Sequence, residues 1–219
     1  MTIELKTPSI VDALADAVRT RVLTGEFPAG SRLTEQEVAS LYGVARPTAK
    51  AAIERVVQTG ILRRTANKSA LVPILSVADI EDLYRSRIFF EREVVANLAG
   101  RRLVTPEASA ALDSLRMAEG PDATAQAVGF DIGFHEALVH AVGSERLNRM
   151  YETIVGEAHL CVAHEQSIFD PTLNWQEHSN LLEAIRTGDV ELAVHRITDH
   201  LQTAADRLVA ARADGAGLR

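Results

Sequence analysis

The chain has 219 residues, of which 47% are apolar, and carries a formal net charge of −7. This length is enough for one sizeable core and a smaller second one, so two domains are expected. The single cysteine, Cys161, excludes an intrachain disulfide, and no apolar run has the length of a membrane span. Since no secretory leader pattern opens the chain, we expect a cytoplasmic protein with no membrane partner.

The first predicted helix covers residues 9–24 and ends at Gly25, where a glycine commonly ends a helix. Its apolar residues, from Ile10 to Val22, recur along one face. Such a helix would pack beneath a following pair of helices.

Residues 35–62 have the pattern of a helix-turn-helix. Val38 and Leu41 share one face of a short helix, and Gly43 follows where the backbone must turn sharply. A longer helix, here called the reading helix, is predicted from Arg46. An ordinary helical hairpin with a solvated basic face is the alternative.

Two short runs, 61–64 and 70–74, flank the polar segment 65–69 and predict a β-hairpin. Residues 1–75 therefore predict a winged helix-turn-helix DNA-binding domain, whose partner is double-stranded operator DNA. Outward-facing polar and basic residues are the expected DNA contacts: Arg32, Gln36, Arg46, Thr48, Lys50, Asn67 and Lys68.

The distribution of charge supports this assignment. Residues 1–75 carry ten Lys and Arg against seven Asp and Glu, whereas residues 76–219 carry thirteen against twenty-three. Within residues 46–68 there are six basic side chains and one acidic side chain. An acidic protein can thus still present a local basic surface to phosphates.

The second predicted domain, residues 76–219, is all-helical, and the fold class is mainly α. Start and stop signals such as Thr105-Pro106 and Gly188-Asp189 separate its segments. They predict an antiparallel bundle of six helices near residues 79–101, 106–118, 122–142, 145–167, 174–187 and 189–212.

Polar residues occupy inward positions on three of these helices. Asp131 and His135 lie one turn apart on the third helix, while His178 and His200 lie on the fifth and sixth. In a hairpin turning at Gly188, these two histidines lie about 15 and 18 Å from the turn and could meet. One carboxylate and three imidazoles suit a divalent metal; we favour zinc, and nickel, manganese and iron stay open. The alternative is a core hydrogen-bond network.

Arg87 is a second inward-facing charge, on the first helix of this domain. It either forms an internal ion pair with Glu91, one turn later, or binds a ligand carboxylate with its guanidinium fork. The sequence leaves both roles open.

Together these residues resemble the GntR-type transcriptional regulators that carry an all-helical FCD (FadR C-terminal-type) ligand domain, and six helices resemble the shorter, VanR-like variant. The stretches that carry the resemblance are 25–33, 43–46, 82–87, 131–135, 177–178 and 199–201. In many relatives, positions matching Asp131, His135, His178 and His200 bind metal. The start of the reading helix, Ala45-Arg46-Pro47-Thr48, departs from the usual order of residues, and the wing tip lacks the usual glycine. The operator sequence therefore cannot be transferred from relatives.

The resemblance implies a homodimeric regulator, with a repressor favoured, that places one reading helix in each operator half-site. A small organic acid would act as effector, with its carboxylate on the metal and Arg87. Two alternatives stay open: a regulator with a metal-free pocket for an apolar or acyl effector, and a metal-dependent hydrolase in which Glu136 or Glu177 assists.

Overall fold

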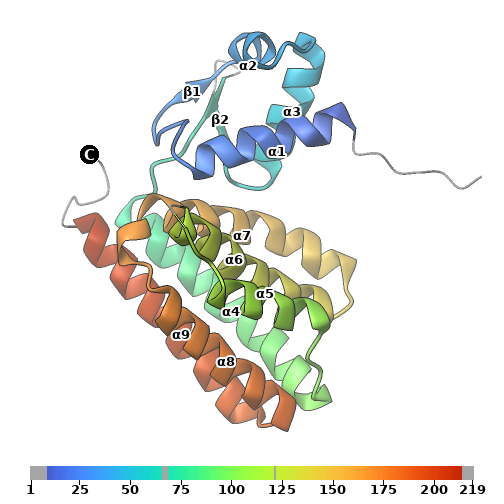
Figure 1. The fold of residues 1–219 in the computed structure, drawn as a ribbon, viewed down its shortest axis with the longest axis vertical. Coiled ribbons are helices and arrows are strands. Elements are labelled where there is room, and N and C mark those ends of the chain that lie inside the picture. The colour runs from blue at the N-terminus through green and yellow to red at the C-terminus, as the bar shows by residue number, and fades with distance from the viewer. Residues whose placement is uncertain (1–8, 66–68, 121, 214–219) are drawn as a thin grey trace, which may run out of the picture. The chain divides into compact units, whose positions relative to one another are not determined.

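The computed structural model describes residues 9–65, 69–120 and 122–213. These residues divide into two compact units, with the division between Ile74 and Leu75. The prediction of a mainly α protein is confirmed, since helices dominate both units (Figure 1). Among the described helices, none combines the length and apolarity that crossing a bilayer would require.

The first unit is a three-helix domain with a small sheet. Helix α3 packs against both α1 and α2. The elements are α1 (Ile10–Leu23), β1 (Arg32–Leu33), α2 (Glu35–Tyr42), α3 (Arg46–Gln58), β2 (Arg63–Arg64) and β3 (Ala70–Leu71). The sheet is antiparallel with the order β1-β3-β2, so the expected hairpin of β2 and β3 gains a third strand at its β3 edge.

Local signals define the helix-turn-helix. Thr34 and Glu37 form a capping box at the start of α2, and Gly43 ends the helix with a left-handed φ of 64°. Two residues placed on the inward faces by their periodicity are exposed instead: Ile10 by 63% and Leu41 by 51%. Both lie at the end of a helix, where the neighbouring elements no longer cover the apolar face.

The second unit contains six α-helices among its described residues, with one short 3₁₀ segment. Side chains of Ser76, Thr105, Ser144 and Asp170 cap the starts of four helices. The bounds are α4 (Val77–Arg101), α5 (Pro106–Arg116), α6 (Ala123–Ala141), α7 (Glu145–His164), η1 (Gln166–Ile168), α8 (Pro171–Thr187) and α9 (Val190–Ala213). Helix α8 begins three residues earlier than predicted, because Asp170 caps it and Pro171 is compatible with its first turn.

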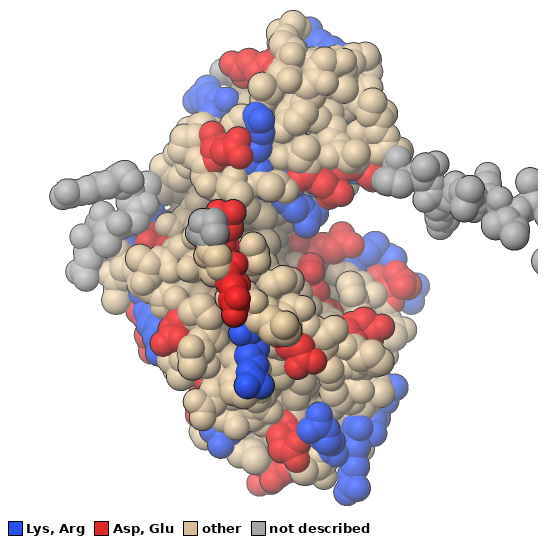
Figure 2. Space-filling view, in the orientation of Figure 1, with Lys and Arg blue, Asp and Glu red and all other residues tan. Residues whose placement is uncertain are grey.

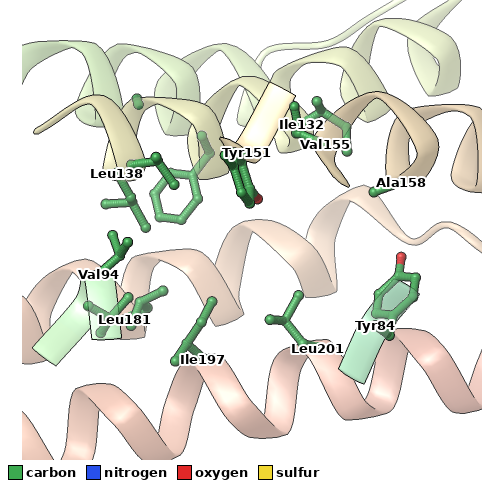
Figure 3. Close-up of a cluster of buried hydrophobic side chains, with 14 of the residues drawn as sticks. Tyr84, Val94, Ile132, Leu138, Tyr151, Val155, Ala158, Leu181, Ile197 and Leu201 are labelled. Atoms are coloured by element: carbon green, nitrogen blue, oxygen red, sulfur yellow. The ribbon is translucent and has the colours of Figure 1, made fainter. Parts of the chain in front are cut away.

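Helix α4 lies at the centre of this unit and contacts α6, α7, α8 and α9. Helices α8 and α9 form a hairpin at Gly188, whose φ is 81° (Figure 1). Apolar side chains fill the space between the helices: Ile197 of α9 points toward the side of the core on which Tyr151 of α7 lies (Figure 3). Four buried polar residues, Asp131, His135, His178 and His200, are embedded in this apolar core.

Candidate metal centre and nucleic-acid interface

The structure brings together the four side chains proposed as metal ligands. Asp131 and His135 come from α6, His178 from α8 and His200 from α9. All four are buried, and one candidate ligand atom of each lies within 4.8 Å of the others. His178 Nε2 is 3.3 Å from Nε2 of His135 and of His200, and 3.5 Å from Asp131 Oδ1.

Two carboxylates orient the histidine rings. His135 Nδ1 lies 2.6 Å from Glu91 Oε2, and His200 Nδ1 lies 2.7 Å from Glu177 Oε2. Because a carboxylate accepts hydrogen bonds, each Nδ1 is the donor, and the Nε2 of each neutral ring keeps its lone pair. Two lone pairs therefore point toward the nitrogen of His178, as in metal sites whose histidines are oriented by carboxylates.

The spacing of these atoms fits a metal ion. Two nitrogens bound tetrahedrally to one zinc at about 2.0–2.1 Å lie about 3.3–3.4 Å apart, and the observed separations are 3.3 Å. A core hydrogen-bond network explains the cluster less well, because it leaves Asp131 Oδ1 buried without a hydrogen-bond partner in the described structure, whereas a cation would bind that oxygen. These four residues could hold a divalent cation.

Burial also keeps the imidazoles of His178 and His135 neutral. It lowers the pKa of His178 well below its usual value, and the neighbouring His200 and His135 lower it further. Burial likewise lowers the pKa of His135, although Glu91 opposes the shift. Neutral imidazoles are the form that binds metal, so His178 and His135 are ready to bind a metal ion near neutral pH.

Arg87 and Glu91 form a buried ion pair beside the cluster. Arg87 Nε donates to Glu91 Oε1 at 2.8 Å, and the hydroxyl of Tyr151 donates to the same oxygen at 2.7 Å. Burial lowers the pKa of Arg87 and raises that of Glu91, but their mutual attraction reverses both shifts, so the pair stays charged. Arg87 Nη2 has no hydrogen-bond partner in the described structure. The guanidinium also lies over the ring of Tyr84, with its Cζ 5.1 Å from the ring centroid. The ion pair therefore leaves one buried guanidinium nitrogen unpaired.

A small cavity of about 40 Å³ adjoins this arrangement. That volume is room for about three water molecules. Arg87, Asp131 and His200 line it together with eight further residues: Tyr84, Val162, Ile168, Phe169, Asn174, Ala204, Arg207 and Leu208. A small molecule bound there would reach both the metal ligands and the guanidinium.

The expected DNA contacts lie on three elements of the first unit. Arg32 of β1, Gln36 of α2 and the α3 residues Arg46 and Lys50 are exposed, whereas Thr48 of α3 is half-buried. Asn67 and Lys68, expected at the wing tip, lie outside the described residues. The described candidates are thus mostly accessible to a partner.

The basic surface is partly neutralised within the unit itself. Arg46 Nε lies 3.3 Å from Glu35 Oε2, Arg55 pairs with Asp12, and Arg64 pairs with Glu54. Two of these acidic partners precede residues 46–68, so a count over that stretch overstates its free positive charge. In Figure 2, acidic and basic side chains are interspersed on the face shown. Lys50 is exposed and has no ion-pair partner in the part of the chain that the structure describes.

Two family models match the chain: "FCD domain" over residues 82–203, and "Bacterial regulatory proteins, gntR family" over residues 10–72. The chain is a GntR-family regulator with an FCD domain. The family resemblance of the sequence is therefore confirmed, and the chain belongs to a family of DNA-binding transcriptional regulators rather than enzymes.

Individual relatives agree with this assignment. An uncharacterised HTH-type transcriptional regulator of Agrobacterium vitis, from the TAR-I ttuE-ttuC' intergenic region, is 33% identical over 41% of this chain and about half, 52%, of its own length. The probable D-xylose utilization operon transcriptional repressor of Paenarthrobacter nicotinovorans is 22% identical over 88% of this chain and 86% of its own. A putative GntR transcriptional regulator from Rhodococcus sp. RHA1 has the same fold, with a TM-score of 0.78 at 21% identity, covering 92% of this chain and 98% of that chain.

The sequence did not identify the side chains that hydrogen-bond to the ligand histidines of this FCD domain or to their carboxylate partners. Glu91 was considered only as a partner of Arg87, and Glu177 only as a catalytic candidate, although both orient histidines. The position of Glu91 on the inward stripe of its helix was a usable signal. Tyr151 gave no comparable signal, because its contact with Glu91 joins residues 60 positions apart.

Proposed function

We propose that this GntR regulator is a homodimeric repressor whose affinity for its operator is controlled by a small organic acid bound at a metal site. The metal ligands would be Asp131, His135, His178 and His200, with zinc favoured. The observation that carries the proposal is the convergence of these four buried side chains beside a cavity that Arg87 also lines. The name of the Paenarthrobacter relative supports repression as the direction of control.

The first unit would supply the contacts with DNA. Arg46, Thr48 and Lys50 lie in the first two turns of α3, the part of a reading helix that contacts base edges in the major groove. Arg32 and Gln36 precede this helix and would position the unit on the phosphates. A homodimer would place two such helices on a two-fold related operator.

The second unit would supply the effector site. A bound divalent ion provides a positive centre that accepts a carboxylate oxygen. Arg87 adds a buried donor, Nη2, which has no hydrogen-bond partner in the described structure. A carboxylate fits both groups, because guanidinium and carboxylate form charge-assisted hydrogen bonds.

A route from effector to DNA follows from the chain order. Helix α4 carries Arg87 and begins at Val77, three residues after Ile74, the last residue of the first unit. A ligand changes operator affinity only if it binds one arrangement of the dimer more tightly than another. We propose that contact with Arg87 biases the position of α4 and hence the spacing of the two reading helices.

The apolar or acyl alternative has less support. Val162, Ile168, Phe169 and Leu208 do give the cavity an apolar wall, but polar and charged side chains such as Asn174 and Arg207 line it as well. In addition, buried polar atoms without partners, such as Arg87 Nη2, call for a polar ligand.

The test requires an operator, which can be selected by this protein from random-sequence duplexes. Fluorescence anisotropy then measures operator affinity for zinc-loaded protein with and without acetate, lactate, pyruvate or succinate. We expect at least one acid to change operator affinity. In Arg87→Lys, which keeps the charge but loses the fork, that response should weaken while affinity without acid stays unchanged.

Two results would count against the proposal. A normal acid response in Arg87→Lys would remove Arg87 from the effector site. A response to medium-chain fatty acids that is equal in metal-free and zinc-loaded protein would favour the apolar alternative.

A further inference from the structure

A second arginine, Arg207 of α9, lines the cavity that Arg87 also lines. Unlike Arg87, it forms no ion pair or hydrogen bond within the described part of the structure, and it is half-buried rather than buried. A half-buried arginine can lay its apolar stem along a wall and keep its charged head near water. Because no carboxylate of the described structure pairs with Arg207, its guanidinium can bind an anionic group at the cavity.

The positions on α9 show where this cation lies relative to the metal ligands. His200, Ala204 and Leu208 are four residues apart and share one face of the helix, all lining the cavity. Arg207 follows His200 by seven residues, about 10 Å along the helix axis. Helical side chains generally lean toward the N-terminus of their helix, which for Arg207 is the direction of His200.

Two cations of different exposure thus line the cavity. Arg87 is 2% exposed and lies beside the metal ligands, whereas Arg207 is more exposed, so its part of the cavity is here called the outer end. Apolar side chains also line the cavity, including Ile168 and Leu208. Asn174 also lines the cavity, but its amide nitrogen already donates to the carbonyl of Asp170 at 3.0 Å. Arg207 is thus the cationic donor left for the outer end.

We infer that the effector is a short dicarboxylate, with one carboxylate at Arg87 and the metal ligands and the second at Arg207. This inference rests on the proposed function and specifies the class of its ligand. The cavity volume of about 40 Å³ has room for one carboxylate and little more, so the second acidic group would lie at the outer end, which is partly exposed. A short apolar linker of two or three carbons matches the apolar side chains that also line the cavity.

The experiment is isothermal titration calorimetry on the full-length, zinc-loaded protein. Succinate and glutarate are compared with butyrate and valerate, which have the same carbon counts but one carboxylate each. The variants are Arg207→Gln and, as a matched control, Arg196→Gln, an exposed arginine of the same helix that does not line the cavity. Zinc content is measured after each titration, so that loss of metal to the acid is detected.

We expect a dicarboxylate to bind wild type at least about ten-fold more tightly than its monocarboxylate partner, the effect of one charge-assisted hydrogen bond. Arg207→Gln should remove this preference and leave monocarboxylate affinity unchanged, and Arg196→Gln should behave as wild type. If monocarboxylates bind as tightly as dicarboxylates, or if Arg207→Gln retains the preference, the inference is overturned while the proposed function stands. If no acid binds the zinc-loaded wild type, the organic-acid effector itself is wrong.

Discussion

The substitution Glu91→Gln probes the metal centre most sharply, because a single carboxylate holds three neighbours. Its oxygens accept hydrogen bonds from Arg87 Nε at 2.8 Å, Tyr151 Oη at 2.7 Å and His135 Nδ1 at 2.6 Å. Glutamine has nearly the same shape but no charge, and its amide group can offer an acceptor to only one side. Two losses follow, one in stability and one in metal affinity.

The loss of stability comes from Arg87, which is 2% exposed and would keep its charge without a counter-ion. Removing one partner of a buried ion pair costs about 3–5 kcal/mol in the free energy of unfolding. The loss of metal affinity comes from His135. The carboxylate of Glu91 holds the proton of His135 on Nδ1 and leaves a lone pair on Nε2, and the amide N–H of the substituted side chain cannot do this. Loss of such an orienting group weakens metal binding by about 10–100-fold.

The two losses can be separated by measurement. Urea unfolding of the metal-free protein reports the first, and zinc competition against a chromophoric chelator reports the second. Glu177→Gln is the matched control, since Glu177 also bonds a ligand histidine but is 28% exposed and pairs with no buried arginine among the described residues. It should lose metal affinity and less than about 1 kcal/mol of stability. Near-wild-type stability and zinc affinity for Glu91→Gln would refute the reasoning.

Three further changes test other parts of the molecule. Lys50→Ala should weaken operator binding and reduce the slope of log affinity against log salt by about one, with zinc affinity unchanged; an unaltered slope would remove Lys50 from the interface. Gly43→Ala places a Cβ at a φ of +64° and should destabilise the first unit by about 1–2 kcal/mol in thermal unfolding, whereas the helical control Gly100→Ala should not destabilise the protein. Burial, and to a smaller extent Arg212, lowers the pKa of His164 in the folded protein. The unfolded chain therefore protonates His164 more readily than the folded protein does. The contribution of neutral His164 to stability is thus full above about pH 6.5 and falls at lower pH. His164→Gln should therefore flatten the decline in stability between pH 6.5 and 5, and an unchanged slope would contradict this.

Most of the fold could be predicted from the sequence, because the residues that start and end its helices act locally. Capping at Ser76 and Thr105 and the left-handed turn at Gly188 each act within a few residues, and they delimit the helices of the second unit. The third strand, β1, was not predicted, because a strand of two residues forms only by pairing with β3, almost forty positions later. Similarly, the exposure of Leu41 depends on which elements reach the end of α2.

Helical periodicity was enough to predict the four proposed metal ligands of the candidate site, but not their surroundings. Asp131, His135, His178 and His200 stood out because polar residues occupied apolar stripes of amphipathic helices. The carboxylates that orient the histidines did not stand out, because contacts such as that of His135 with Glu91 link positions 44 residues apart. Arg207 was missed for the same reason: it lies at the edge of the inward face of α9, and only the packed structure shows that it lines the cavity.

The most direct test of the central claim is the metal content of tag-free protein, measured by elemental analysis in the native form and in a His178→Ala, His200→Ala double variant. Both proteins are equilibrated with zinc and then dialysed, and operator binding confirms that each one is folded. We expect about one metal ion per chain in the native protein and none in the variant. Absence of metal from both, with operator binding intact, would contradict the metal-held effector site and assign the histidines to the core.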